Sequence, residues 1–373
     1  MRRRERGSGA SGLVLFLAAL GAFLLGIGRL PAPSATPAAT PPAAAAPEPA
    51  PAPVPEVSPA AAPEAAPLIS PAAAAPGPAP APAPEVFPAA APEAAPLVLP
   101  EPASPRVLDI GDLRRPRIRA AAAMLYNPRS DEVIWERRGL DQRPIASITK
   151  VMTALVLLDQ DPDLSRDVVV SRRDARRSST TYLRSGERVT LDTLLHLALI
   201  ASDNVAARIL ARASGWGTRR FVERMNLKAA ALGLDGTRFV EPSGLDERNV
   251  STPYDVARLI AVASEAPAIS GIMRKWTHGV RTDRRRLNIR NTNRLLRSPH
   301  VVRGGKTGYI SEAGYCLTAV VEVPGAGPVV LVVLGAGSNA GRFSEARRLA
   351  DWVSTTGRSL LDPRQGAGRD SAR

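Results

Sequence analysis

The segment Ser147-Ile-Thr-Lys150 places a hydroxyl and an amine three residues apart. Apolar spacing predicts a buried helix over 147–158, and residues i and i+3 of a helix share one face, so the amine can reach the hydroxyl. A serine hydroxyl is a poor nucleophile until a base takes its proton. A lysine can be that base when burial and nearby positive charge lower its pKa. Taken alone, the pattern more often indicates a helix-capping serine followed by a surface lysine.

Ser202-Asp203-Asn204 separates two predicted apolar helices, over 191–201 and 205–213. Ser202 could relay a proton between Lys150 and a leaving amine. Asn204 could hold a substrate amide or orient the lysine. All three residue types also favour turns and helix caps, so this segment alone indicates a structural role.

Lys306-Thr307-Gly308 falls on a predicted strand over 303–309 and follows Gly304-Gly305. Small residues would let a substrate backbone lie against the strand edge. The lysine supplies positive charge for a substrate carboxylate, and the threonine supplies a hydroxyl donor. The alternative is a strand with an exposed lysine and a glycine at a bulge.

The three segments are more informative together than apart. The chain has four lysines, and two of them lie in these motifs. Ser202 follows Ser147 by 55 residues, and Lys306 follows Ser202 by a further 104. SxxK, SDN and KTG in this order are typical of penicillin-binding proteins and class A β-lactamases. The combination therefore predicts nucleophilic catalysis by Ser147.

From about Arg119 to Trp352 the chain resembles the serine D-alanyl-D-alanine carboxypeptidases and endopeptidases, which are low-molecular-mass penicillin-binding proteins. The segment 291–314 is most similar to the endopeptidase subgroup, which cleaves D-alanyl cross-links between peptidoglycan strands. The carboxypeptidase subgroup often carries a second, C-terminal β-domain and a C-terminal anchor, and this chain ends soon after a predicted helix over 343–354. Further matching segments are Arg143–Ser147, Thr237–Leu245, Ser251–Thr252 and Gly314–Leu317.

The resemblance implies a role for each motif residue. Ser147 would attack the carbonyl of the penultimate D-alanine, with Lys150 as general base and Ser202 passing the proton to the leaving amine. Lys306 would keep the local field positive, and Asn204 would bind the substrate amide.

The resemblance also implies where the substrate lies. Thr307 would meet the terminal carboxylate or its equivalent in a cross-link. The backbone N–H groups of Ser147 and of Tyr309, which follows Gly308, would form the oxyanion hole. The substrates would be peptidoglycan stem peptides and their cross-links. β-Lactams would acylate Ser147 and persist there, and no metal or other cofactor is expected.

Three other functions remain as alternatives. One is a carboxypeptidase that trims terminal D-alanine from pentapeptides. Another is a class A β-lactamase, which needs a glutamate in an ExxxN segment to activate the deacylating water; Glu223-Arg-Met-Asn226 is one residue too short and follows Ser202 too closely. The last is an inactive peptidoglycan-binding scaffold, although such proteins usually lose the serine or lysine that this chain retains.

Predicted strands near both ends of the foldable region enclose a series of predicted helices. This order indicates an α+β fold of the penicillin-binding-protein/β-lactamase type. The terminal strands would pair into one antiparallel sheet flanked by helices, the middle would form a helical lobe, and the active site would lie in the cleft between them. The predicted strands lie at 119–125, 132–136, 168–170, 303–309, 316–323 and 328–334, and further predicted helices at 219–232 and 252–264.

The first 105 residues predict export and a spacer. Residues 1–30 consist of a basic start and an apolar run over 13–28. A helix over that run would span ~24 Å, which is shorter than the ~30 Å hydrocarbon core of a membrane. A signal peptide fits best, and an uncleaved membrane anchor is the alternative. Residues 31–105 hold 25 of the 36 prolines, so a disordered linker is expected. The catalytic domain is predicted over 106–358, with a disordered tail over 359–373. The expected location is the periplasm or the outer face of the cytoplasmic membrane.

Composition excludes several classes of function. Cys316 is the single cysteine and the three histidines lie far apart in the sequence, which argues against a disulfide or a zinc site. Residues 106–373 carry 44 Lys and Arg against 28 Asp and Glu. That balance would attract anions, nucleic acids among them. Aromatic residues, however, make up 4% of the chain, which is too few to stack on the bases of a single strand. Nucleic-acid binding is therefore not expected.

Overall fold

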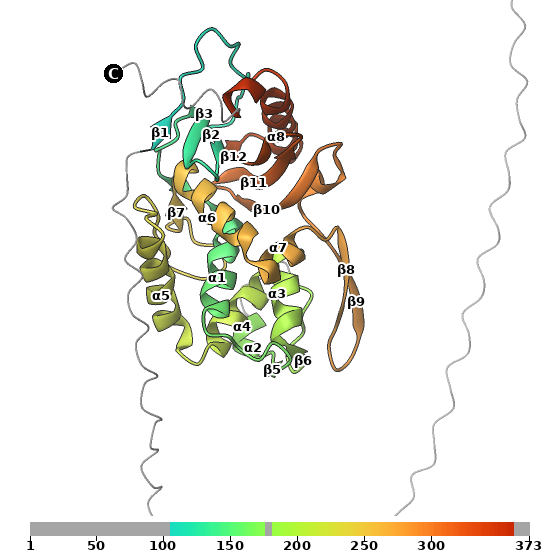
Figure 1. Cartoon of the computed structure of the whole chain (residues 1–373). Helices are drawn as coiled ribbons and strands as arrows, with labels where there is room; N and C mark the ends of the chain where they lie inside the picture. The colour runs from blue at the N-terminus through green and yellow to red at the C-terminus, as the bar shows by residue number, and fades with distance from the viewer. Residues whose placement is uncertain (1–104, 176–180, 362–373) are drawn as a thin grey trace, which may run out of the picture. The chain divides into compact units, whose positions relative to one another are not determined.

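The two ends of the folded chain meet in one six-stranded sheet, with strand order β1-β3-β2-β12-β11-β10. The computed structural model describes residues 105–175 and 181–361 (Figure 1). All neighbouring strands are antiparallel except β1 and β3. β12 pairs directly with β2, and Val332 lies opposite Met124. The predicted pairing of the terminal strands is therefore confirmed. The strands are β1 (Arg106–Val107), β2 (Ala122–Asn127), β3 (Glu132–Arg137), β10 (Val301–Ile310), β11 (Gly314–Val323) and β12 (Gly327–Ala336).

Helices from the middle of the chain form a lobe against one face of the sheet (Figure 1). The first of them is its centre, because every residue from Thr149 to Leu157 is buried. Side chains of Thr190, Asp203 and Thr252 cap three of the helices by accepting a backbone N–H, as expected for these residue types. The helices are α1 (Thr149–Leu158), α2 (Arg172–Ala175), α3 (Leu191–Leu199), α4 (Asn204–Ala213), α5 (Gly217–Ala231), α6 (Pro253–Glu265) and α7 (Pro267–Met273).

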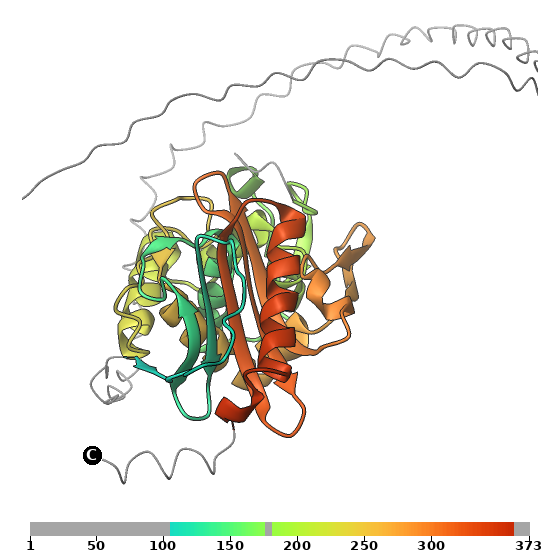
Figure 2. The same ribbon diagram turned by 90° about the horizontal axis from the view of Figure 1, so that it is seen from above.

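α8 (Asn339–Ser354) covers the opposite face of the sheet, and Figure 2 shows it lying along the strands. The Glu345 carboxylate on this helix accepts hydrogen bonds from the backbone N–H groups of Arg119 and Ala120. The helix is thereby tied to the segment that leads into β2. The described chain continues to Leu361 in η3 (Arg358–Leu361), three residues beyond the predicted domain boundary.

Three short ladders complete the fold, and of their strands the sequence predicted only β5 (Asp167–Val169), at 168–170. The largest joins β8 (Thr277–Arg281) and β9 (Arg286–Arg290) beside the helical lobe (Figure 1). Its tip is held by Arg285, which pairs with the buried carboxylate of Glu187 at 2.6 Å. The other pairs are β4 (Arg143–Pro144) with β7 (Val250–Ser251), and β5 (Asp167–Val169) with β6 (Arg188–Thr190).

The single cysteine and one of the three histidines are buried. Cys316 is fully buried on β11, and His196 is 5% exposed on α3, where it stacks on His278 with 4.0 Å between ring centroids. Among the described residues, no single helix is long and apolar enough to cross a membrane, although the bent pair α6 and α7 together meet those criteria. The predicted signal, linker and most of the predicted tail lie outside the described residues.

Candidate active site

Ser147 lies in a short 3₁₀ turn, η1 (Ala146–Ile148), that leads directly into α1. Lys150 occupies the first turn of α1, and its Nζ lies 2.7 Å from Ser147 Oγ. Ala146 has a φ of 47°, an uncommon value for a residue with a side chain. The turn places the hydroxyl and the amine on one face, as the i, i+3 spacing predicted.

Two further acceptors surround the amine of Lys150. Its Nζ donates to Asn204 Oδ1 at 2.7 Å and to the carbonyl oxygen of Ser243 at 2.5 Å. The lysine is fully buried. Burial lowers the pKa of Lys150 to about 7, although the carboxylates of Glu241 and Asp203 oppose the shift. A substantial fraction of the amine is therefore neutral near pH 7.

The break between α3 and α4 brings Ser202 and Asn204 to the same place as Lys150. Ser202 has a φ of 61°, which turns the chain sharply between the two helices. Asp203 has a structural role: its carboxylate caps α4 at Ala206 N and accepts from the backbone of Tyr182. The two flanking side chains are thus left to contact the lysines of the site.

Lys306 reaches the same loop from β10, the edge strand of the sheet. Its Nζ donates to Ser202 Oγ at 2.8 Å and to the carbonyl oxygen of Thr307 at 3.0 Å. Burial lowers the pKa of Lys306 well below its usual value, and the positive charges of Lys150 and Arg342 add to the shift. The structure thus joins all three sequence motifs in one hydrogen-bonded cluster.

Gly308 lets β10 approach the turn that carries Ser147. A Cβ added at Gly308 would lie 2.7 Å from the carbonyl oxygen of Ile145 and 3.1 Å from the backbone nitrogen of Ser147. The space that this glycine leaves is therefore filled by the protein's own backbone, not by an approaching substrate. Tyr309, the next residue, is half exposed and stacks on Tyr315. The strand holds its backbone beside the nucleophile.

Comparison with known proteins agrees with this geometry. A model of the peptidase S11 family, described as D-alanyl-D-alanine carboxypeptidase, matches residues 112–338. The chain belongs to this family. The predicted resemblance is confirmed.

Relatives of both subgroups share the match. A D-alanyl-D-alanine endopeptidase of Pseudomonas aeruginosa is 36% identical over 245 residues, 63% of this chain and 77% of that protein. An endopeptidase of the same description from Escherichia coli is 34% identical and covers 65% and 79% of the two chains. The crystal structure of a D-alanyl-D-alanine carboxypeptidase from Mycobacterium tuberculosis superposes with a TM-score of 0.62 at 29% identity, covering 68% and 96%. The predicted α+β fold of penicillin-binding proteins is confirmed.

The S11 peptidase supports its lysine with a carboxylate that the motif analysis did not single out. Glu241 lies in the loop whose Ser243 carbonyl contacts Lys150. Its oxygens accept hydrogen bonds from Ser243 N at 2.8 Å, from Leu245 N at 2.9 Å and from Gly244 N, and from Asn249 Nδ2 at 2.8 Å. The carboxylate therefore organises the loop and has little capacity left to activate a water.

Removing this carboxylate is expected to weaken the fold. Glu241→Ala leaves the buried N–H groups of Ser243 and Gly244 without an acceptor, which should lower the free energy of unfolding by about 2–4 kcal/mol. Urea unfolding monitored by circular dichroism measures the effect. Glu247→Ala is the matched control, because Glu247 is an exposed carboxylate of the same loop. Equal stability of the two variants would contradict the structural role of Glu241.

Glu223, the residue considered as the water-activating glutamate of a β-lactamase, is not placed for that role. It lies on α5, its side chain is 57% exposed, and it pairs with Arg219. Asn226 is occupied by the backbone of Phe239. Neither residue belongs to the cluster around Lys150, which argues against the β-lactamase alternative.

Arg342 and Thr292 are further residues of the site that the motifs did not reveal. Arg342 on α8 is 7% exposed and donates to the carbonyl oxygen of Gly308 at 2.9 Å. Burial lowers the pKa of Arg342 to about 10. The hydroxyl of Thr307 donates to Thr292 Oγ1 at 2.6 Å. Thr292 lies within the segment 291–314, whose similarity to the endopeptidase subgroup was the available signal for it.

Proposed function

We propose that this S11 peptidase hydrolyses D-alanyl bonds of peptidoglycan stem peptides through an acyl-enzyme on Ser147, and that cross-links are its main substrate. The contacts of Lys150 carry the proposal. A neutral amine has two N–H donors and one lone pair. The carbonyl oxygens of Asn204 and Ser243 can only accept, so they take both donors. The lone pair is left facing the hydroxyl of Ser147.

Acylation then follows from this arrangement. The proton of Ser147 passes to the Lys150 lone pair while Oγ forms a bond to the substrate carbonyl carbon. The backbone N–H groups of Ser147 and Tyr309 would stabilise the oxyanion. The C–N bond breaks, and the proton moves from Lys150 through Ser202 to the leaving amine. Water then adds to the ester and regenerates the serine.

The charge of the substrate and the charge of Lys306 are linked in this proposal. Thr307 would contact the carboxylate next to the leaving amine, and Asn204 would bind a substrate amide. An entering carboxylate favours the protonated form of a nearby lysine. A substrate carboxylate near Lys306 would therefore oppose the lowering of its pKa by burial and support the positive field that the resemblance assigns to this lysine.

Products distinguish the two subgroup activities. Mass spectrometry should show monomers released from cross-linked muropeptide dimers by the purified enzyme. The endopeptidase proposal has the support of the similar P. aeruginosa and E. coli proteins. Loss of a terminal alanine from pentapeptides, with dimers left intact, would instead indicate the carboxypeptidase. Unchanged cell wall would indicate the inactive scaffold.

The rate of acylation should depend on pH through Lys150. The base is active when neutral, so the second-order rate constant for penicillin should reach a plateau above pH about 7. Below that value it should fall about tenfold per pH unit, because the neutral fraction does so. Stopped-flow acylation measures the profile. A flat profile between about pH 5 and 8 would contradict Lys150 as the base.

The cellular location is also a proposal. The basic start and apolar run of residues 1–30 support export by a signal peptide or a membrane anchor. The proline-rich stretch would then act as a tether between that segment and the catalytic domain. N-terminal sequencing of the protein from membrane and soluble fractions distinguishes a cleaved signal from a retained anchor.

A further inference from the structure

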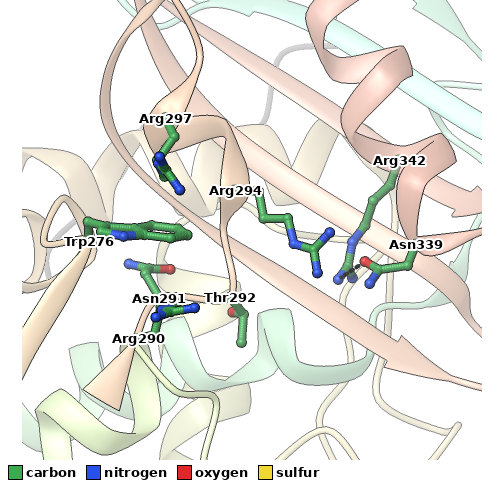
Figure 3. Close-up of a pocket in the computed structure, with 8 residues that line it drawn as sticks. All are labelled: Trp276, Arg290, Asn291, Thr292, Arg294, Arg297, Asn339 and Arg342. Atoms are coloured by element: carbon green, nitrogen blue, oxygen red, sulfur yellow. Dashed lines mark hydrogen bonds between the residues drawn. The ribbon is translucent and has the colours of Figure 1, made fainter. Parts of the chain in front are cut away.

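A pocket of about 610 Å³ adjoins the catalytic cluster (Figure 3). It is of the size that holds a substantial ligand. We call it the arginine pocket, because four arginines contribute to its wall. The wall of the pocket includes Trp276, Arg290, Thr292, Arg294, Arg297 and Arg342.

Two of the arginines in the pocket are positioned by cation–π contacts with Trp276. The guanidinium carbons of Arg290 and Arg297 lie 5.9 and 5.5 Å from the ring centroid of Trp276, and Figure 3 shows the two side chains on opposite sides of the ring. A cation–π contact positions a guanidinium beside the ring and leaves its N–H groups free to bind an anion. Trp276 directly precedes β8, so its indole lies at the base of the β8–β9 hairpin.

The charge of the pocket is not neutralised by the protein. Within residues 105–175 and 181–361, no carboxylate forms an ion pair with Arg290, Arg294, Arg297 or Arg342. Arg294 points toward Arg342 and Asn339 (Figure 3). Asn339 is the first residue of α8, whose N-terminal end carries partial positive charge. Arg290, Arg294 and Arg297 are exposed, so their N–H groups are accessible to an anionic ligand. Arg342 is held by the carbonyl oxygens of Gly308 and Cys316 and adds its charge from behind them.

The arginine pocket adjoins β10, the strand whose Thr307 would contact the leaving group. Thr292 lines it and receives the hydrogen bond of Thr307. Arg342 also lines it and binds the carbonyl oxygen of Gly308. A ligand whose carboxylate lies at Thr307 would therefore extend into the pocket on its leaving-group side.

We infer that the arginine pocket binds the leaving stem peptide of a cross-link through its additional carboxylates. This inference rests on the proposed function and specifies its substrate. A free D-alanine leaving group has a single carboxylate, which Thr307 would already contact. It therefore has no further carboxylate for the arginines of the pocket to bind. The leaving group of a cross-link is itself a stem peptide with further carboxylates. Charge and volume both fit the larger leaving group.

The double variant Arg294→Gln/Arg297→Gln tests the inference. The kcat/KM for cleavage of a muropeptide dimer should fall about 10- to 100-fold, as for the loss of one or two charge-assisted hydrogen bonds. Acylation by penicillin and release of alanine from a pentapeptide should change far less, since neither carries the leaving stem peptide. Arg281→Gln/Arg286→Gln is the control, with the same change in charge on exposed residues of the β8–β9 hairpin.

A dimer completes the test in which only the additional carboxylates of the leaving stem are amidated and the carboxylate next to the scissile bond stays free. The wild type should cleave it as slowly as the double variant cleaves the native dimer, and the double variant should lose nothing more. Unchanged dimer cleavage by the double variant would overturn the arginine pocket and leave the acyl-enzyme intact. An equal loss on all three substrates, or an equal loss in the control, would also overturn it. Failure of the wild type to be acylated by penicillin would instead remove the proposed function itself.

Discussion

Lys150→Ala is expected to slow the acylation of Ser147 by penicillin about 10²–10⁴-fold, the range that a positioned general base contributes. The reason is the 2.7 Å contact between Nζ and the serine hydroxyl, which no other amine of the cluster makes. Time courses of labelling with a fluorescent penicillin measure the rate. Thermal unfolding of the variant shows whether the fold survives.

Lys228→Ala is the control for this loss. Lys228 lies on α5 and pairs with Asp159 at the surface, so its removal takes one lysine away without touching the cleft. Labelling of this variant should match that of the wild type. Fast labelling of folded Lys150→Ala would show that a different group removes the proton.

Gly308→Ala should reduce acylation about 10²–10³-fold, as removal of an oxyanion-hole donor does. The added methyl would lie 2.7 Å from the carbonyl oxygen of Ile145, so β10 must move away from the turn that carries Ser147. That movement separates the backbone N–H groups of Ser147 and Tyr309. The second-order rate constant for penicillin, measured on folded protein, reports the effect.

Gly279→Ala separates this effect from a general cost of alanine in a strand. Gly279 lies on β8, and no atom lies within 4 Å of its added Cβ. Its acylation rate should be that of the wild type. A Gly308→Ala variant as fast as Gly279→Ala would show that the close approach has no role in binding the oxyanion.

Much of the fold was predictable, because its main elements have clear periodicity. The helices predicted at 191–201 and 205–213 form as α3 and α4 with shifted ends, and the break at Ser202 is where expected. The strands predicted at 316–323 and 328–334 form as β11 and β12. Their apolar runs are buried on both faces, and such runs are readable from local sequence alone.

The β8–β9 hairpin was missed for the opposite reason. Its strands read THGVR and RLNIR, so most side chains are polar and the apolar alternation is too short to detect. What holds it is remote in sequence: Arg285 reaches Glu187, and His278 stacks on His196. Such contacts leave no local pattern.

For this protein the sequence by itself determined the reactive groups, since the order and spacing of SxxK, SDN and KTG already predict an active-site serine with a lysine base. Tertiary structure alone decided their environment. Burial moves the pKa of Lys150 to about 7, and the contacts of Asn204 and Ser243 orient its lone pair. The tertiary structure also brings Arg294, Arg297 and Arg342 together around one pocket. Desolvation and long-range packing depend on which distant segments meet, and residue spacing does not record that.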